Sequence, residues 1–164
     1  MKKFSSKLKK IKLVITDVDG VLTDGGLYYT KEGLVMKKFN VKDGMGTRRL
    51  KEYGFACGII SSDGSDIIKA RNKRLEMDFL ITDTWNKLEK LKEICEEKNL
   101  KLENVAYLGD DINDFEIING VGFSAAPSDA VDSILNSVDY VCKLKGGEGV
   151  FREFAELIIS AQKQ

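Results

Sequence analysis

Histidine is absent from the 164 residues of the chain. Its absence excludes Ser-His-Asp hydrolases, phosphohistidine chemistry and zinc sites with imidazole ligands. Any catalysis must therefore rest on carboxylates, lysine, hydroxyl groups or a metal ion held by oxygen atoms.

Cysteine is scarce. Cys57, Cys95 and Cys142 form no CxxC pair, and none is followed six positions later by the arginine that a cysteine-phosphatase loop requires. We interpret them as small core residues. Unpaired cysteines of this kind are typical of a protein of the reducing cytoplasm.

Long apolar runs and an excess of one charge are missing too. No stretch approaches the roughly 20 apolar residues that cross a bilayer, and the 26 basic residues balance the 26 acidic ones. The sequence also lacks a basic stripe with interleaved aromatic residues. We therefore expect no membrane and no nucleic acid among its partners, and we expect the basic residues 1–10 to form a short solvated tail.

Apolar runs of strand length alternate with segments of helical period along the chain. The apolar content of 43% is enough for one core, so we expect a single domain over residues 1–164. The alternation predicts an α/β fold, a Rossmann-like parallel sheet with helices on both faces. A small β-hairpin insertion is predicted across about 27–39. The expected strands include 11–17, 55–61, 79–82 and 105–110, and the expected helices lie near 44–53, 65–75, 86–98 and 128–136 and from about 149.

Three of the expected strands end in polar residues. Asp17, Ser61 and Asp110 each close an apolar run. Because open parallel sheets place their sites at the carboxyl ends of the strands, these three segments should converge on one site.

The turn after the first strand carries two carboxylates two positions apart. Asp17 and Asp19, in the segment DVDGVLT, can both point into one cleft. One carboxylate can attack phosphorus while the other manages the proton of the leaving group. A solvated acidic turn is the plain alternative. An EF-hand loop is excluded, because its sixth and twelfth positions would hold Leu22 and Tyr28 instead of glycine and glutamate.

Three acids lie within five residues at the end of the strand 105–110. Asp110, Asp111 and Asp114 would repel one another without a cation. Ligands that are all oxygen indicate Mg²⁺ rather than zinc. Capping of a helix by Asp110 or Asp111 is an additional role that we expect beside metal binding.

Two weaker signals complete the set. Ser61 and Ser62 end a strand and precede a helix, where hydroxyl and backbone N–H groups can hold phosphate. Lys87 lies at the start of the helix 86–98, an unfavourable end for a cation unless an anion binds nearby. Taken singly, each serine is also compatible with a helix cap, and Lys87 with a surface lysine.

The order Asp-x-Asp, Ser, Lys and Gly-Asp-Asp-x-x-Asp resembles that of the haloacid dehalogenase superfamily over about residues 11–153. A narrower similarity lies in DVDGVLTDGGLYY, FNVKDGMG, YLGDDIND and GGEGVFRE. These segments are similar to the capless 3-deoxy-D-manno-octulosonate 8-phosphate phosphatase-like family, which includes phosphatases of nine-carbon, sialic-acid-type 9-phosphates. The resemblance implies a phosphoric monoester hydrolase acting on a small phosphorylated sugar acid of lipopolysaccharide or sialic acid biosynthesis.

The resemblance also implies the catalytic roles. Asp17 would attack phosphorus and form an aspartyl-phosphate. Asp19 would protonate the leaving sugar oxygen and then activate water. Ser61, Ser62 and Lys87 would hold the phosphoryl oxygens.

A Mg²⁺ site follows from the same resemblance. The ion would be held by the Asp17 carboxylate, the main-chain carbonyl of Asp19 and Asp110. Asp111 and Asp114 would lie near it or orient its waters.

The family resemblance further implies an assembly without a separate cap domain. The hairpin at about 27–39 would help to build a homotetramer, and the C-terminal tail, residues 146–164, would reach a neighbour's site. Gly146, Gly147, Gly149 and Arg152 would then close that site in trans. On their own, these glycines are also compatible with an ordinary loop before a helix.

One position departs from the pattern. Family members acting on the eight-carbon substrate have Ser-Gly-Arg after the second strand, where this chain has Ser61-Ser62-Asp63. Relatives acting on nine-carbon acids have an acidic residue there and a basic one further along the helix, so Asp63 and Arg74 are candidate substrate contacts. Asp63 is equally compatible with a helix cap. The length of the sugar therefore stays open.

Other functions share parts of this pattern. A broader sugar phosphatase or a phosphomutase would use the same chemistry, although a mutase normally needs a mobile cap. A receiver domain has its acidic doublet after the first strand and its acceptor aspartate after the third, the reverse of the order here. A non-catalytic oligomerisation module associated with a sugar-nucleotide transferase is disfavoured by the presence of both aspartates and Lys87.

Overall fold

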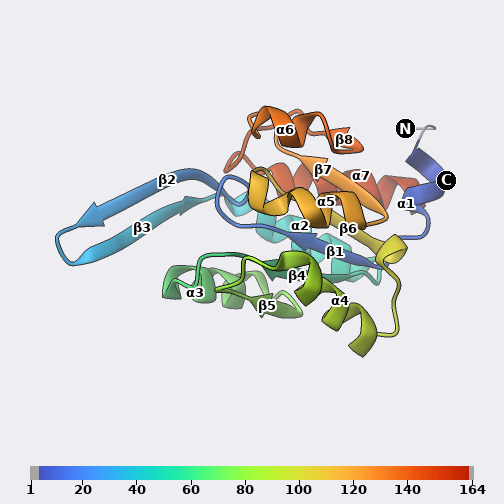
Figure 1. Ribbon diagram of the computed structural model, residues 1–164, viewed down its shortest axis with the longest axis horizontal. Helices are drawn as coiled ribbons and strands as arrows, with labels where there is room; N and C mark the ends of the chain where they lie inside the picture. Colours follow the sequence, from blue (N-terminus) through green and yellow to red (C-terminus); the bar gives the residue numbers. More distant parts are fainter. Residues whose placement is uncertain (1–3, 163–164) are drawn as a thin grey trace.

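The computed structural model describes residues 4–162, and a six-stranded sheet forms its centre (Figure 1). The strand order is β5-β4-β1-β6-β7-β8, and every neighbouring pair is parallel. The chain starts at the centre, fills one half of the sheet and crosses to the other, so the order reverses between β1 and β6. The predicted α/β fold with a Rossmann-like parallel sheet is confirmed. The strands are β1 (Leu13–Thr16), β4 (Ala56–Ile60), β5 (Phe79–Ile81), β6 (Val105–Leu108), β7 (Phe123–Ala126) and β8 (Tyr140–Val141).

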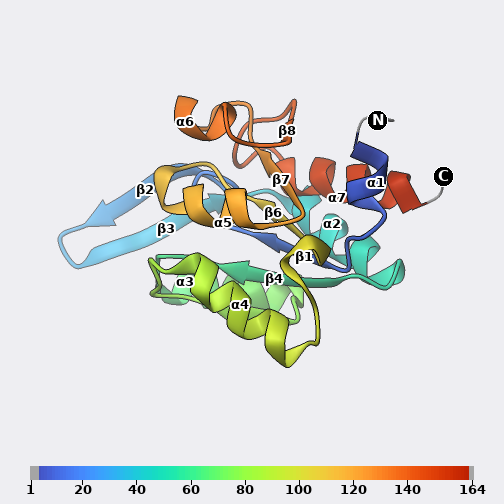
Figure 2. The same cartoon turned by 45° about the vertical axis from the view of Figure 1, so that its right-hand side comes forward.

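Helices cover both faces of the sheet (Figure 2). Side chains alternate along each strand: in β1, Val14 faces one hydrophobic cluster while Leu13 and Ile15 face the other. Burial on both faces explains why the strands are continuous apolar runs. The first cluster includes residues of α1 (Ser5–Leu8), α2 (Val41–Glu52), α3 (Asp66–Leu75) and α7 (Val150–Gln162), and the second includes residues of α4 (Lys87–Glu97), α5 (Phe115–Gly120) and α6 (Asp132–Leu135).

The hairpin between β1 and α2 projects from the body of the molecule (Figure 1). Its strands, β2 (Thr23–Thr30) and β3 (Gly33–Phe39), are antiparallel. The hairpin begins at Thr23 rather than near residue 27, because Thr23 still pairs with Phe39 beyond the glycines of the first strand. Several of its apolar side chains are exposed: Leu27, Tyr28, Tyr29, Val35 and Met36.

The N-terminal segment is not a solvated tail where the structure describes it. Leu8 is buried in the first cluster, and the ring of Phe4 packs edge-to-face on Phe123 with 5.6 Å between centroids. Apolar residues four positions apart share one helix face, and their burial outweighs the lysines around them. Residues 1–3 of this predicted tail lie outside the described residues.

The C-terminal segment is mostly a core helix. α7 begins at Val150, next to the predicted start near 149, and buries Phe151, Phe154 and Ile158. Only residues 163–164 of the predicted tail 146–164 lie outside the described residues. Across residues 4–162, none of the helices combines the length and the apolar character of a membrane span.

Candidate active site

A cleft of about 460 Å³ opens at the carboxyl ends of β1 and β6, where the strand order reverses. The structure brings Asp17, Ser61 and Asp110 together there, as the strand ends predicted. Other predicted site residues that line the cleft are Asp19, Ser62 and Asp111.

Asp17 directly follows β1 and continues its hydrogen-bonding ladder. Its N–H donates to the carbonyl of Leu108 on β6 at 2.9 Å, which fixes the backbone at this point. The Oδ2 atom lies 2.8 Å from Nζ of Lys87. Burial, and then the charge of Asp114, raise the pKa of Asp17 to about 7 despite Lys87. One cation is therefore too little to keep this carboxylate fully ionised.

Lys87 is the first residue of α4, and its side chain is only 1% exposed. Its Nζ also contacts Asp114 at 2.6 Å. Burial alone would lower the pKa of Lys87, but the carboxylates of Asp17 and Asp114 raise it above its ordinary value. Asp114 in turn accepts hydrogen bonds from the Tyr107 hydroxyl at 2.6 Å and from the N–H of Asp110 at 2.9 Å. Asp114 thereby fixes both the lysine and the acidic loop.

The carboxylates of this cleft offer oxygen ligands for a divalent cation. One oxygen each from Asp17, Asp110 and Asp114 lies within 4.8 Å of the others. Asp114 is engaged by Lys87, whereas Asp17 Oδ1 and Asp110 Oδ1 are buried and accept no hydrogen bond within residues 4–162. Burial, Asp17 and Asp114 raise the pKa of Asp110 to about 8. A hard cation between Asp17 and Asp110 would satisfy both oxygens, so the residues fit the predicted Mg²⁺.

Gly20 lets the first loop approach Asp110. Its φ of 77° is left-handed, and a Cβ at this position would stand 2.0 Å from Oδ2 of Asp110. A side chain at position 20 would therefore displace a candidate metal ligand. The glycine of the DVDG segment thus has a steric role in the site.

Asp19 contacts the hairpin. Its Oδ1 accepts a hydrogen bond from Oγ1 of Thr23 at 3.2 Å, and its Oδ2 lies 2.5 Å from Nζ of Lys37 on β3. Lys37 was not predicted as a site residue. In the sequence it is one of two adjacent lysines, and only the packing of the hairpin distinguishes the buried Lys37 from the exposed Lys38.

Ser61 and Asp111 line the cleft but differ in exposure. Ser61 is buried at the end of β4, with Ser62 beside it. Asp111 is exposed and accepts the N–H of the next residue at 2.6 Å, so it caps the 3₁₀ turn Ile112–Asp114. The predicted capping role falls to Asp111, while Asp110 lies in the carboxylate cluster.

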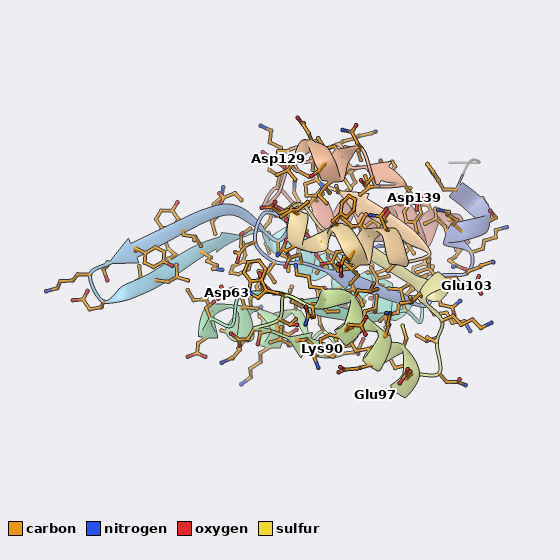
Figure 3. All side chains as sticks on the ribbon, in the orientation of Figure 1. Asp63, Lys90, Glu97, Glu103, Asp129 and Asp139 are labelled. Atoms are coloured by element: carbon orange, nitrogen blue, oxygen red, sulfur yellow. The ribbon has the colours of Figure 1, made fainter. Side chains whose placement is uncertain are left out.

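The structure does not bring Asp63 and Arg74 together. Asp63 contacts Nζ of Lys37 and accepts hydrogen bonds from the N–H and the hydroxyl of Ser65, each at 2.9 Å. Figure 3 places it near the point where the hairpin joins the body. Arg74 lies at the far end of α3, in a separate groove of about 470 Å³ with Arg71. Because α3 separates the two side chains, these two candidate substrate contacts do not lie in one groove of the chain.

The glycine segment before α7 lies against its own chain. A Cβ at Gly146 would stand 2.0 Å from the carbonyl oxygen of Gly20, and Gly147 is similarly close to the start of β2. The segment therefore supports the loop that carries Asp17 and Asp19. Neither Gly149 nor Arg152 lines the cleft of its own chain as far as the structure describes it.

Trp85 lines the cleft and was not predicted from the sequence. It lies between β5 and α4, its side chain is 75% exposed, and it lines the cleft with Ile112. An aromatic residue in a loop follows neither a core pattern nor a catalytic motif. The one available signal is that the chain has a single tryptophan.

The sequence matches a known protein family and named relatives. The profile of the haloacid dehalogenase-like hydrolase family matches residues 48–154. The chain is 36% identical to the 3-deoxy-D-manno-octulosonate 8-phosphate phosphatase of Haemophilus influenzae, over 95% of this chain and 87% of the relative. The protein of the same name from Escherichia coli K12 is also 36% identical, over 96% of this chain and 84% of the relative.

Solved structures match the whole fold. A probable YrbI family phosphatase from Pseudomonas syringae has a TM-score of 0.96 at 40% identity, over 99% of this chain and 92% of that one. The 3-deoxy-D-manno-octulosonate 8-phosphate phosphatase of Moraxella catarrhalis was solved with magnesium, phosphate and KDO. Its TM-score is 0.95 at 34% identity, over 99% of this chain and 94% of that one.

Proposed function

Since the chain belongs to the haloacid dehalogenase-like hydrolases and, among them, to the 3-deoxy-D-manno-octulosonate 8-phosphate phosphatase family, we propose that it is a Mg²⁺-dependent phosphatase of a 3-deoxy-2-ulosonic acid phosphate. The first candidate substrate is 3-deoxy-D-manno-octulosonate 8-phosphate, and a sialic-acid-type 9-phosphate is the second. The observation that carries the proposal is the pair of buried oxygens, Asp17 Oδ1 and Asp110 Oδ1, which have no partner among the described residues. The other oxygen of Asp17 lies 2.8 Å from Nζ of Lys87.

The reaction begins at Asp17. One of its oxygens attacks phosphorus, the bond from phosphorus to the sugar oxygen breaks, and an aspartyl-phosphate remains. Asp19 gives its proton to the departing oxygen, so the sugar leaves as an alcohol. Lys87 and the hydroxyl of Ser61 stabilise the negative charge on the phosphoryl oxygens.

Water completes the reaction. It attacks the phosphorus of the aspartyl-phosphate while Asp19 takes up a proton, so inorganic phosphate leaves and the Asp17 carboxylate is restored. Asp114 keeps Lys87 in place through both steps. When bound by Asp17, Asp110 and the main-chain carbonyl of Asp19, Mg²⁺ neutralises the charge that the carboxylates and the phosphoryl group bring together.

The size of the cleft supports a sugar phosphate as substrate. Asp17, Ser61 and Lys87 account for the phosphoryl end. A volume of about 460 Å³ is in the range of small-molecule sites and leaves room for a sugar beside Trp85 and Ile112. The KDO bound to the Moraxella catarrhalis relative supports a sugar acid as product.

Assembly and location are parts of the same proposal. Exposed apolar residues of the hairpin, such as Tyr29 and Met36, support a homotetramer joined through β2 and β3. The C-terminal segment with Arg152 would reach a neighbour's site, so Arg152→Ala should lower turnover. If light scattering shows a monomer and that monomer is fully active, both the homotetramer and the contribution of the C-terminal segment to a neighbour's site are wrong. Free, buried cysteines support a reducing compartment, the cytoplasm.

The deciding experiment is Mg²⁺-dependent phosphate release from a panel of substrates. It contains 3-deoxy-D-manno-octulosonate 8-phosphate, nine-carbon ulosonate 9-phosphates and common hexose phosphates, with Asp17→Asn protein as blank. We expect a strong preference for one ulosonate phosphate and complete loss in the blank, whose circular dichroism should be unchanged. Weak hydrolysis of all compounds would reduce the function to a broad sugar phosphatase. No release from any compound would favour a non-catalytic module.

A further inference from the structure

Two buried lysines of this site each stand between two carboxylates. Lys87 lies between Asp17 and Asp114, the arrangement used in the proposed reaction. Lys37 lies in the same way between Asp19 and Asp63. Each proposed catalytic carboxylate is therefore held by its own lysine, and the proposed reaction assigns no role to Lys37.

Lys37 is buried against the pattern of its strand. Within β3, all of which the structure describes, it is the only buried residue, and its side chain is 1% exposed. A buried ammonium group requires opposite charge and hydrogen bonds. Burial alone would lower the pKa of Lys37, but Asp19 and Asp63 raise it above its ordinary value. The hairpin thus brings a fixed positive charge to Asp19.

Asp19 is held at both oxygens. Thr23 donates to Oδ1, and Lys37 donates to Oδ2. A side chain on a loop can otherwise sample several rotamers. A general acid must stand within hydrogen-bond reach of the atom that it protonates, so restricting Asp19 to one orientation raises the rate of the chemical step.

Asp63 is engaged inside the protein. Its Oδ1 accepts the N–H of Ser65, and its Oδ2 accepts both the Ser65 hydroxyl and Lys37. These contacts use both oxygens of the carboxylate. Asp63 is therefore in position to hold Lys37 in place and is not aimed at a ligand in the cleft.

We propose that Lys37 is the positioning residue for Asp19, and that Asp63 acts through Lys37 and not on the sugar. The inference rests on the proposed function, because it takes Asp19 to be the acid and base of a phosphatase. It also explains the departure at Ser61-Ser62-Asp63: the acidic residue there serves the catalytic carboxylate and leaves the choice of sugar to other residues.

The test compares Lys37→Met with Lys38→Met. Lys38 is the adjacent residue on β3, but its side chain is 62% exposed and pairs with Asp24. For the preferred ulosonate phosphate we expect Lys37→Met to lower kcat by about 30-fold or more, within the range of general acid–base catalysis, with KM changed less than about threefold. Lys38→Met should have wild-type kinetics.

p-Nitrophenyl phosphate separates positioning from general damage. Its leaving group departs without a proton, so the first-turnover burst of p-nitrophenolate in Lys37→Met should stay within about threefold of wild type. Steady turnover should fall, because Asp19 must still activate water. Lys37→Arg keeps a cation and should recover at least about tenfold in kcat over Lys37→Met.

Asp63→Asn is a further test of the role of Lys37. It takes the place of Lys37→Met if the Lys37→Met protein does not fold. We expect it to lower kcat several-fold without changing the order of preference among sugar phosphates. The proposal is overturned if Lys37→Met leaves kcat unchanged or changes KM alone, if burst and turnover fall equally, or if Asp63→Asn changes the preferred sugar.

The wild-type protein separates this proposal from the proposed function. If it hydrolyses p-nitrophenyl phosphate but no ulosonate phosphate, the proposed substrate is wrong. The comparison of burst with turnover in the Lys37 variants then still decides the role of Lys37.

Discussion

Trp85 is the only tryptophan of the chain and lines the cleft, so its fluorescence reports on one place. We expect the sugar acid product, 3-deoxy-D-manno-octulosonate, to change the emission, because a sugar that covers an exposed indole removes it from water. Inorganic phosphate should leave the emission nearly unchanged, since Asp17, Ser61 and Lys87 would hold it at the other end of the substrate. The measurement is a titration at saturating Mg²⁺, with emission followed at fixed protein concentration.

The control for this titration is Trp85→Phe, which keeps an aromatic ring but removes the signal. Asp17→Asn protein extends the measurement to the intact substrate, because it should bind without turnover. Equal responses to phosphate and to the sugar acid would contradict the assignment of Trp85 to the sugar end. No response to either compound would place the sugar away from Trp85.

At the residue scale, the sequence predicted the side chains that follow strands. Asp17, Ser61 and Asp110 were predictable because the carboxyl ends of parallel strands meet at one edge. Lys37 was not predictable, because its burial depends on how the hairpin packs against the loops that carry Asp19 and Asp63. Arg74 lies away from the cleft because α3 rises about 1.5 Å per residue, so the nine residues from Ser65 to Arg74 span roughly 13 Å along the helix.

At the element scale, Asp43 joins two helices. It lies on α2 and accepts the N–H of Arg152, in the first turn of α7, at 3.1 Å. The first N–H groups of a helix have no partner within it, so Asp43 acts as a cap from a neighbouring helix. Burial raises the pKa of Asp43 to about 6, against the backbone N–H groups of Arg152 and Phe151 that lower it.

We expect Asp43→Ala to lower the free energy of unfolding by about 1–3 kcal/mol, since a buried N–H loses its acceptor. Asp43→Asn keeps an oxygen at this place and should stay within about 1 kcal/mol of wild type at pH 8. Urea denaturation measures both. If alanine and asparagine destabilise equally, the charge of Asp43 and not its capping bond stabilises the contact between α2 and α7.

The prediction of elements succeeded where both faces of a strand are buried, and it was wrong at the N-terminal segment and at the start of the hairpin. The strands were found because both faces of the sheet are covered, which makes each strand a continuous apolar run. The segment 4–10 was misjudged because three lysines there suggested solvent, while Leu8 is buried and Phe4, on the same helix face, packs against the core. The start of the hairpin was misplaced because it was located from the apolar run that begins at Leu27, whereas Gly25 and Gly26 also lie within β2.

For the molecule as a whole, the carboxylate cluster links stability to pH. In the folded, metal-free protein the pKa of Asp17 is about 7 and that of Asp110 about 8, against 3.8 for an ordinary aspartate. Between about pH 4 and pH 8, these two groups bind more protons in the folded chain than in the unfolded one. Their contribution to the free energy of unfolding is therefore complete below about pH 4, falls as pH rises from there, and is fully lost above about pH 8.

Mg²⁺ should reverse this loss. Binding requires ionised carboxylates, so the ion displaces protons below pH 8 and binds more tightly as pH rises. We expect the increase in Tm caused by Mg²⁺, relative to EDTA, to be larger at pH 8.5 than at pH 5.5. Each tenfold gain in affinity adds about 1.4 kcal/mol, or roughly 3–6 °C in a chain of this size. Differential scanning fluorimetry at the two pH values measures it.

Asp110→Asn provides the matched control, because it removes one buried acid and one metal ligand but keeps the shape of the side chain. Without metal at pH 8.5 it should be at least as stable as the wild type, since a buried ionisable group has become neutral. Its Tm should respond little to Mg²⁺ at either pH. If the wild-type response to Mg²⁺ were the same at both pH values, the ion would bind without displacing protons. The raised pKa values of Asp17 and Asp110 would then not describe the site that holds it.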